Sequence, residues 1–363
     1  MKSNNKGIGL GSISFFQTTL LILFCGFSPV QSEIIEFKPR IERTRPVIAV
    51  IAENTMTELT DFVVPYGVMK RSGVADVFAL STEPGPVQMF PSLRIQADST
   101  IETFDSRFPA GADFVFVPAV HKSDDAKLIS WIQAQAGKGA TIIGICDGVW
   151  VLAKAGLLEG QQATGHWNSL ADLEKQFSKT IWIKNQRYVI NRKIVTTTGV
   201  TASVPVALAL VESIGGKAKA ETLARELAVE DYSKTHNSKE FQLSANVVWA
   251  AIRNLVSFWG KDRIGIEASP GVDEISLALI ADSYGRTYRS SSVLLAKSPV
   301  ITRSGLTFLP EVGKGDIDRT VCAREVEIPA MTALRTALQN IEAWYGTATR
   351  RFVALQIELA DIQ

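Results

Sequence analysis

The sequence predicts a parallel α/β protein whose sheet is covered by helices on both faces. Short apolar, β-branched runs alternate along the chain with segments that carry apolar residues at helical spacing. A glycine-flanked cysteine, Cys146, lies between one such run and the next helical segment. The composition is that of an ordinary globular protein, with 46% hydrophobic residues and a formal net charge of +1 over 363 residues. The absence of a basic excess argues against a nucleic-acid-binding protein.

The elements of the first half follow in chain order. Buried strands are predicted where the apolar runs fall, at residues 46–51, 75–80, 93–97, 113–117 and 140–143. Helices are predicted at residues 57–71, 124–137, 149–156, 168–176 and 201–214, with a strand hairpin at residues 188–197. In such a sheet reactive groups belong at the carboxyl ends of the strands, which is where Cys146 falls.

Residues 144–148, with the sequence GICDG, have the pattern of a nucleophile elbow that carries cysteine in place of serine. Gly144 and Gly148 leave room for the neighbouring strand and helix. The following helix N-terminus favours thiolate over thiol at Cys146, and the amide of Asp147 is placed to stabilise an oxyanion. The same five residues also fit an inert buried cysteine in a tight turn.

The pattern extends well beyond the elbow. It continues as AGLLEG at residues 155–160, ATGHW at residues 163–167, TGVTA at residues 198–202 and ESIGG at residues 212–216. With these segments, residues 46–216 resemble the DJ-1/PfpI family of class I glutamine amidotransferase-like proteins. The branch that they resemble most includes isonitrile hydratases and the ligand-binding domains of AraC-type regulators. The resemblance implies a flavodoxin-like α/β sandwich, which agrees with the order of the elements.

The resemblance also implies three catalytic side chains. Cys146 matches the family nucleophile, and Asp61 matches an acidic residue that hydrogen-bonds the thiol. His166 matches a histidine near the nucleophile, which could assist proton transfer. From the residues alone, a solvated helix face is the preferred interpretation of Asp61, and His166 also fits a hydrogen-bonded histidine packed by Trp167.

The chain departs from the family pattern at two places. PfpI-type proteases carry histidine directly after the cysteine, and this chain has Asp147 there, which argues against protease activity. The Pro-Gly-Gly turn of the family is replaced by PAV at residues 118–120, so the backbone donor expected at Ala119 has less conformational freedom. His121 follows this turn and could enter the pocket. We expect neither a metal nor a cofactor, because the sequence has no metal-ligand spacing and no phosphate loop.

The N-terminus resembles a secretory signal peptide over residues 1–32. Lys2 and Lys6 precede an uncharged stretch at residues 13–30, and small residues follow at the positions that a signal peptidase prefers. We therefore expect an exported protein, periplasmic or secreted. An uncleaved membrane anchor is the alternative, because the stretch is nearly long enough to span a bilayer.

The sequence divides into three parts after this segment. We expect a DJ-1/PfpI-like domain at residues 44–230, a linker with a helix at residues 231–262, and a smaller α/β part at residues 263–363. Acidic and basic residues are roughly balanced in the last part, and we find no helix-turn-helix pattern there, so no nucleic-acid partner is expected.

The last part resembles a truncated repeat of the first domain. Residues 284–290 (YGRTYRS) echo residues 66–72 (YGVMKRS), and residues 306–310 (LTFLP) echo residues 93–97 (LRIQA). The second copy carries no elbow, because Cys322 has no flanking glycines. It could take the place of a dimer partner and give a pseudo-dimeric monomer; a homodimer is the alternative.

Two functions remain open from the sequence. The first is an exported cysteine-dependent hydrolase or hydratase/lyase that acts on a small molecule through Cys146, with Asp61 and His166. The second is a non-enzymatic ligand-binding or redox-sensing protein that has kept the fold and the thiol.

Overall fold

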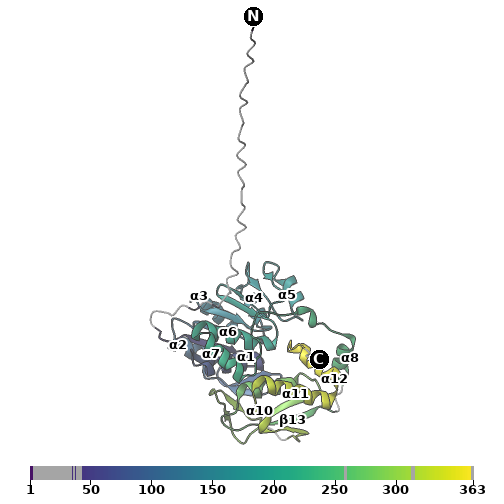
Figure 1. Cartoon of the computed structure of the whole chain (residues 1–363). Coiled ribbons are helices and arrows are strands. Elements are labelled where there is room, and N and C mark those ends of the chain that lie inside the picture. The colour runs from purple at the N-terminus through teal and green to yellow at the C-terminus, as the bar shows by residue number, and fades with distance from the viewer. Residues whose placement is uncertain (3–34, 36, 38–42, 257–259, 312–314, 361–363) are drawn as a thin grey trace. The chain divides into compact units, whose positions relative to one another are not determined.

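The computed structural model describes residues 1–2, 35, 37, 43–256, 260–311 and 315–360 (Figure 1). The expected signal peptide lies outside the described residues except for its first two positions. Residues Ile34–Gln363 group as one compact unit. In the described part of the chain, no helix has the length and apolar character needed to cross a membrane.

A seven-stranded sheet forms the centre of the first domain within the described residues, in the order β11-β12-β8-β7-β1-β3-β6. Its strands are β1 (Val47–Ala52), β3 (Asp76–Ser81), β6 (Ser99–Thr100), β7 (Phe114–Val117), β8 (Thr141–Gly144), β11 (Tyr188–Asn191) and β12 (Ile194–Thr197). Every neighbouring pair is parallel except β11 and β12, which form the predicted hairpin. Strands β1, β7 and β8 are buried along their whole length, which explains their unbroken apolar sequences.

Helices cover both faces of this sheet, so the predicted flavodoxin-like sandwich is confirmed. One face carries α1 (Leu59–Ser72), α6 (Ser203–Gly215) and α7 (Lys217–Glu226). The other carries α2 (Ile101–Arg107), α3 (Ala126–Gly137), α4 (Gly148–Lys154) and α5 (Leu170–Gln176). Side chains of β1 alternate between the two cores, with Ile48 and Val50 on the α1 side and Ala49 and Ile51 on the other.

The second α/β part repeats this plan on a smaller scale. Its parallel sheet has the order β14-β13-β17, which matches the order β3-β1-β7 of the first domain. The elements are β13 (Asp262–Glu267), α9 (Glu274–Gly285), β14 (Ser290–Leu295), β17 (Arg319–Val321), α10 (Ala323–Val326), α11 (Ala330–Tyr345) and α12 (Thr347–Gln356). Helices α11 and α12 meet at Gly346 with φ 87° and ψ 161°, and α6 and α7 meet at Gly216 with φ 87° and ψ 159°. Within the described residues, the second copy therefore keeps the closing helices and has no counterpart of the elbow segment.

The two copies pack against each other about an approximate two-fold axis. Helix α1 contacts α9, and β5 (Arg94–Gln96) pairs antiparallel with β16 (Thr307–Leu309). The pairing centres on Ile95 and Phe308, which are equivalent positions in the sequence echo. The second copy thus covers a face of the first domain within one chain.

The helices show that the sequence echo aligned the two copies incorrectly at one arginine. Glu58 caps α1 and Asp273 caps α9, and Arg71 pairs with Asp273 just as Arg286 pairs with Glu58. This arrangement makes Arg71 equivalent to Arg286, whereas the echo aligned Arg71 with Arg289, about one helical turn away. The caps and the ion pairs determine the helix register, and neither is visible in the apolar pattern.

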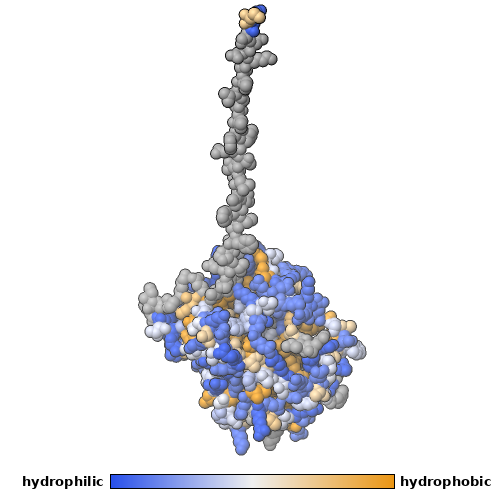
Figure 2. Space-filling model, viewed as in Figure 1, coloured by the Kyte–Doolittle hydropathy of each residue, from blue (hydrophilic) through white to orange (hydrophobic). Residues whose placement is uncertain are grey.

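The remaining elements are short or lie between the two copies. They are β2 (Thr57–Glu58), β4 (Pro86–Phe90), β9 (Gln162–Ala163), β10 (Ile181–Trp182), β15 (Val300–Ile301), the 3₁₀ turns η1 (Val200–Ala202) and η2 (Ser238–Glu240), and α8 (Ala245–Val256). Helix α8 is the helix expected in the linker, and residues 257–259 of that prediction lie outside the described part. Hydrophilic residues cover most of the face seen in Figure 2, with hydrophobic residues in separate small groups.

Candidate active site

Cys146 lies between β8 and α4 in a strained turn. Its φ of 52° is in the left-handed region, which non-glycine residues seldom adopt, and its amide donates to Thr197 Oγ1 at 3.1 Å. A Cβ at Gly148 would lie 2.1 Å from the carbonyl oxygen of Val117, and one at Gly144 would lie 3.0 Å from Leu152 Cδ2. Glycine is therefore required at position 148 by the backbone of β7, whereas a side chain at position 144 would need only a small shift of Leu152.

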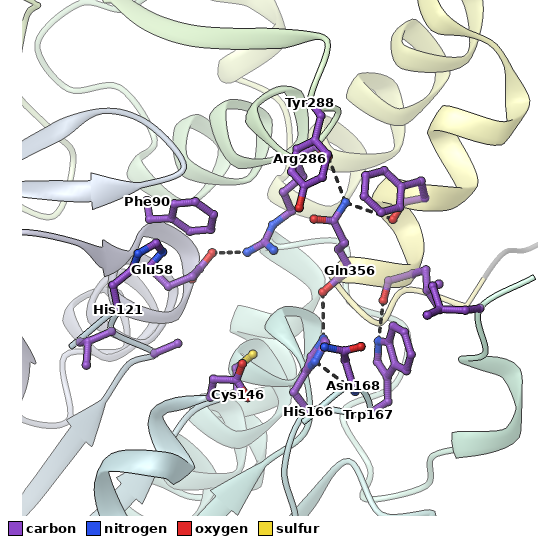
Figure 3. A pocket seen from close by; sticks show the side chains of 16 residues that line it. Glu58, Phe90, His121, Cys146, His166, Trp167, Asn168, Arg286, Tyr288 and Gln356 are labelled. Atoms are coloured by element: carbon purple, nitrogen blue, oxygen red, sulfur yellow. Dashed lines mark hydrogen bonds and ion pairs between the residues drawn. The ribbon is translucent and has the colours of Figure 1, made fainter. Parts of the chain in front are cut away.

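A cavity of about 370 Å³ has Cys146 in its wall and is lined by both copies (Figure 3). The first domain contributes Glu58, Phe90, Ala119, Val120, His121, Cys146, Asp147, His166, Trp167 and Asn168. The linker contributes Leu243, and the second copy contributes Arg286, Tyr288, Phe352, Leu355 and Gln356. The sequence did not indicate that the second copy completes the pocket, because the contributing residues follow no local motif.

Asp61 is fully buried on α1, next to the cavity. Its Oδ2 accepts a hydrogen bond from the Ala119 amide at 3.2 Å, and its buried Oδ1 has no hydrogen-bond partner among the described residues. Burial raises the pKa of Asp61 to about 7, so its protonated form is well populated at neutral pH. The Ala119 amide, which the sequence suggested as an oxyanion donor, is bound to Asp61 here. The other suggested donor, the Asp147 amide, lies at the start of α4.

The thiol of Cys146 is set in acidic surroundings. Burial raises its pKa well above the ordinary value, and the charges of Asp61, Asp147 and Glu58 raise it further. These effects oppose the thiolate stabilisation that we expected from the N-terminus of α4, a helix of only seven residues. The site therefore holds a neutral thiol near neutral pH.

Glu58 and Arg286 form an ion pair that the sequence analysis did not identify. Arg286 Nη2 donates to Glu58 Oε1 at 2.6 Å, and its Nε donates to Asp282 Oδ2 at 2.6 Å. Burial, followed by the charge of Asp61, raises the pKa of Glu58 to about 7. Glu58 caps α1 in the structure, but glutamate is not a typical N-cap residue, so no clear signal for it was present in the sequence. Arg286 carried no signal either.

His166 lines the cavity, and both of its ring nitrogens are engaged. Nδ1 accepts from the Asn168 amide at 3.3 Å, so the proton lies on Nε2, which donates to the Gln356 carbonyl at 3.1 Å. His121 also lines the cavity, with its ring 4.9 Å from that of Phe90. His121 is exposed, and in the described part of the chain its ring has no hydrogen-bond partner, so its ring nitrogens are free to act as a base.

The described residues contain no cluster of three or more His, Cys, Asp or Glu side chains that could hold a metal ion. The groups of this chain that lie at or beside the cavity are the thiol, the buried carboxyls, Arg286 and the histidines.

The Asp61→Asn variant is expected to be less sensitive to pH in its stability than the wild type. A native pKa raised from 3.8 to about 7 stabilises the folded state at low pH, and this contribution is lost as the pH rises through 7. Between about pH 5 and about pH 8, the wild type should lose roughly 2–3 kcal/mol of unfolding free energy through this group, and the variant should not.

Urea unfolding at both pH values measures this difference, with the exposed Asp172→Asn as the matched control. Equal losses of stability in the wild type and Asp61→Asn would contradict the assignment of a raised pKa to Asp61.

Residues 46–213 match the DJ-1/PfpI family, which confirms the resemblance found in the sequence. The chain is 28% identical over 123 residues to the HTH-type transcriptional regulator GbdR of Pseudomonas aeruginosa, a match that covers 34% of this chain and 32% of the regulator. It is 32% identical over 104 residues to an isonitrile hydratase of Pseudomonas putida, with coverage of 29% and 44%. The chain thus spans less than half the length of these curated relatives.

Two solved structures are among those to which the chain is similar. Oxidized DJ-1 of Toxoplasma gondii has a TM-score of 0.45 and 24% identity, with 51% of this chain and 100% of that chain covered. A THiJ/PfpI family protein of Pseudomonas syringae has a TM-score of 0.49 and 22% identity, with coverage of 64% and 92%.

Proposed function

We propose that this chain, whose residues 46–213 belong to the DJ-1/PfpI family, is a cysteine-dependent hydratase that adds water to a small molecule at an electrophilic carbon. The observation that carries the proposal is the thiol of Cys146, which a strained elbow holds at the wall of a cavity beside the buried carboxyl of Asp61. Strain and buried ionisable groups of this kind cluster at functional sites.

The neutral state of the thiol favours an addition over a displacement. When a thiol adds to an isonitrile, R–NC, a bond forms between sulfur and the terminal carbon, and a proton is transferred to that carbon. Water then attacks the same carbon, the carbon–sulfur bond breaks, and the thiol regains a proton as the formamide R–NH–CHO leaves. Asp61, protonated in part at neutral pH, can give its proton to the carbon and take up the proton that the thiol loses as the sulfur–carbon bond forms. In the second step one proton of the water goes to the nitrogen and the other returns to the sulfur.

Amide hydrolysis fits the geometry less well. It needs a free base and free oxyanion donors. Both ring nitrogens of His166 and the amide of Ala119 are already hydrogen-bonded, so among the described residues this reaction would have to use the His121 ring as its base and the Asp147 amide as its oxyanion donor. The similarity to an isonitrile hydratase of Pseudomonas putida also supports a hydration reaction.

The proposal is tested by incubating the purified protein with a small aliphatic isonitrile such as n-butyl isonitrile and measuring the formamide by mass spectrometry. We expect turnover by the wild type and a loss of about 10³-fold or more in Cys146→Ser, because the nucleophile is removed. Cys322→Ser is the matched control, since Cys322 is an exposed cysteine of the second copy and its replacement should leave the rate unchanged.

Two results would overturn the hydratase proposal. One is no formamide above the buffer background across a panel of isonitriles. The other is formamide at the same rate in the wild type and Cys146→Ser.

A ligand-binding or sensing protein without catalysis is the second candidate. The raised pKa of the Cys146 thiol and the engaged ring of His166 favour it. In that case ligands of the cavity would raise the midpoint of thermal unfolding while no product formed, and Cys146→Ser would bind them as well as the wild type.

Export and a monomeric state are further parts of the proposal. Lys2, Lys6 and the uncharged stretch that follows support a signal peptide, and the packing of the second copy on the first supports a pseudo-dimeric monomer. Cell fractionation with N-terminal sequencing tests the first statement, and light scattering tests the second.

A further inference from the structure

We propose that the cavity binds a small carboxylate and that Arg286, from the second copy, is the residue that anchors the carboxylate group opposite Cys146. This inference rests on the proposed function and names the substrate class of the same site.

The guanidinium of Arg286 is held rigidly with one nitrogen unused. Nε donates to Asp282 and Nη2 donates to Glu58, each at 2.6 Å. Among the described residues, Nη1 has no hydrogen-bond partner, although Arg286 is only 9% exposed. The residue lines the cavity, and Figure 3 shows its guanidinium directed into the space that Cys146 also faces. Nη1 is not one of the fully buried polar atoms that lack a partner, so it is accessible from the cavity, and an anionic ligand that accepts a hydrogen bond from it gains a charge-assisted contact.

Arg71 is the equivalent of Arg286 in the first copy, and among the described residues it makes only ion pairs between the two copies. It crosses the same interface to Asp273 and Glu274. Its side chain is 7% exposed, close to the 10% of Arg286. Arg71 does not line the cavity that contains Cys146. An arginine can therefore link the two copies without lining the cavity, so the ion pairs alone do not explain why Arg286 faces the thiol.

The ligand class follows from the groups around Nη1. A planar guanidinium edge matches a carboxylate, which can accept two parallel hydrogen bonds. The walls beside Arg286 are aromatic, formed by Phe90, Tyr288 and Phe352, and suit a compact apolar body. Arg286 and Cys146 line the same cavity. A carboxylate held by Arg286 would accordingly present a nearby carbon to the sulfur.

The acidic surroundings of Arg286 can adjust to an incoming anion. Glu58 is in contact with Asp61 on its own helix and with Arg286 and Asp282 on α9. Its pKa, raised to about 7 by burial, allows it to take up a proton when the ligand carboxylate arrives. The positive charge of Arg286 would then be available to the ligand.

Alkylation of Cys146 by two matched reagents tests the proposal. Iodoacetate carries a carboxylate and iodoacetamide a neutral amide of nearly the same size. With either reagent the sulfur bonds to the CH₂ carbon, the carbon–iodine bond breaks, iodide leaves and the thiol proton passes to solvent. The measured quantity is the ratio of the two second-order rate constants, followed by intact mass in a Cys322→Ser background.

We expect this ratio to exceed that of free N-acetylcysteine by about 10-fold or more, since hydrogen bonds to a charged group are involved. Arg286→Gln should return the ratio to within about 2-fold of the free thiol, and Arg286→Lys should give an intermediate value because charge remains without the planar edge. Arg71→Gln, which breaks the equivalent contact outside the cavity, should keep the wild-type ratio.

Equal ratios in the wild type and Arg286→Gln, or equal losses in Arg286→Gln and Arg71→Gln, would overturn the proposal. If Cys146 reacts with neither reagent, thermal unfolding with propionate and propionamide decides. Stabilisation by propionate alone, lost in Arg286→Gln and kept in Arg71→Gln, supports the carboxylate site, and its absence overturns it.

Neither measurement needs turnover, so the two proposals can fail separately. A carboxylate preference without formamide production would overturn the hydratase and retain the binding site. Formamide production without a carboxylate preference would support the hydratase and overturn the carboxylate site.

Discussion

Replacing Gly148 by alanine is expected to lower the free energy of unfolding by about 3–5 kcal/mol, the range of severe steric and packing defects. The added Cβ would lie 2.1 Å from the carbonyl oxygen of Val117 and 2.9 Å from two backbone atoms of Pro118. Backbone cannot move aside as a flexible side chain can, so β7 or the elbow itself must shift. Urea unfolding followed by circular dichroism measures the loss.

Gly137→Ala is the matched control for the same chemical change. Gly137 ends α3, and an added Cβ there would meet nothing within 4 Å. The control should leave stability unchanged or raise it by up to about 1 kcal/mol, because alanine favours the helix. A Gly148→Ala protein within about 1 kcal/mol of the wild type would show that α4 does not approach β7 this closely.

Glu58→Ala is expected to lower the free energy of unfolding by about 3–5 kcal/mol at about pH 8, the cost of removing one partner of a buried ion pair. The change removes a carboxylate at 2.6 Å from Arg286 and also removes the N-cap of α1. Arg286 would remain buried, with Asp282 as the partner of its Nε. Denaturant titration measures the loss.

Glu83→Ala provides the comparison with an exposed ion pair. Glu83 lies 2.7 Å from Lys127, but its side chain is 59% exposed. Its removal should cost less than about 1 kcal/mol, since exposed pairs contribute little. Similar losses in the two variants would mean that the interface between the copies is more hydrated than the structure indicates.

Local patterns were enough to predict the fold of the first domain and the position of the elbow that carries Cys146. The apolar runs that became β1, β7 and β8 are continuous because these strands are buried on both faces. The elbow could be found because its glycines, Gly144 and Gly148, lie next to Cys146 in the sequence. Such features depend on neighbours within a few residues, and one sequence is sufficient to show them.

The environment of the site depends on contacts that no local pattern records. Glu58 and Arg286 are 228 positions apart, and His166 and Gln356 are 190 apart. The sequence suggested a second copy, but it could not show that this copy supplies an arginine to the cavity and engages the ring of His166. The raised pKa of Cys146 likewise follows from burial and from carboxylates that only the folded chain brings together.

The most direct test of Cys146 as a nucleophile is to mix the protein with n-butyl isonitrile, stop the reaction in acid within milliseconds, and determine the masses of the protein and its peptides. We expect a mass increase equal to one isonitrile on the peptide that contains Cys146, absent in Cys146→Ser and decaying at the rate at which formamide appears. Formamide production by the wild type without this adduct would show that Cys146 is not the nucleophile. An adduct that never decays would show that the protein captures the molecule and does not turn it over.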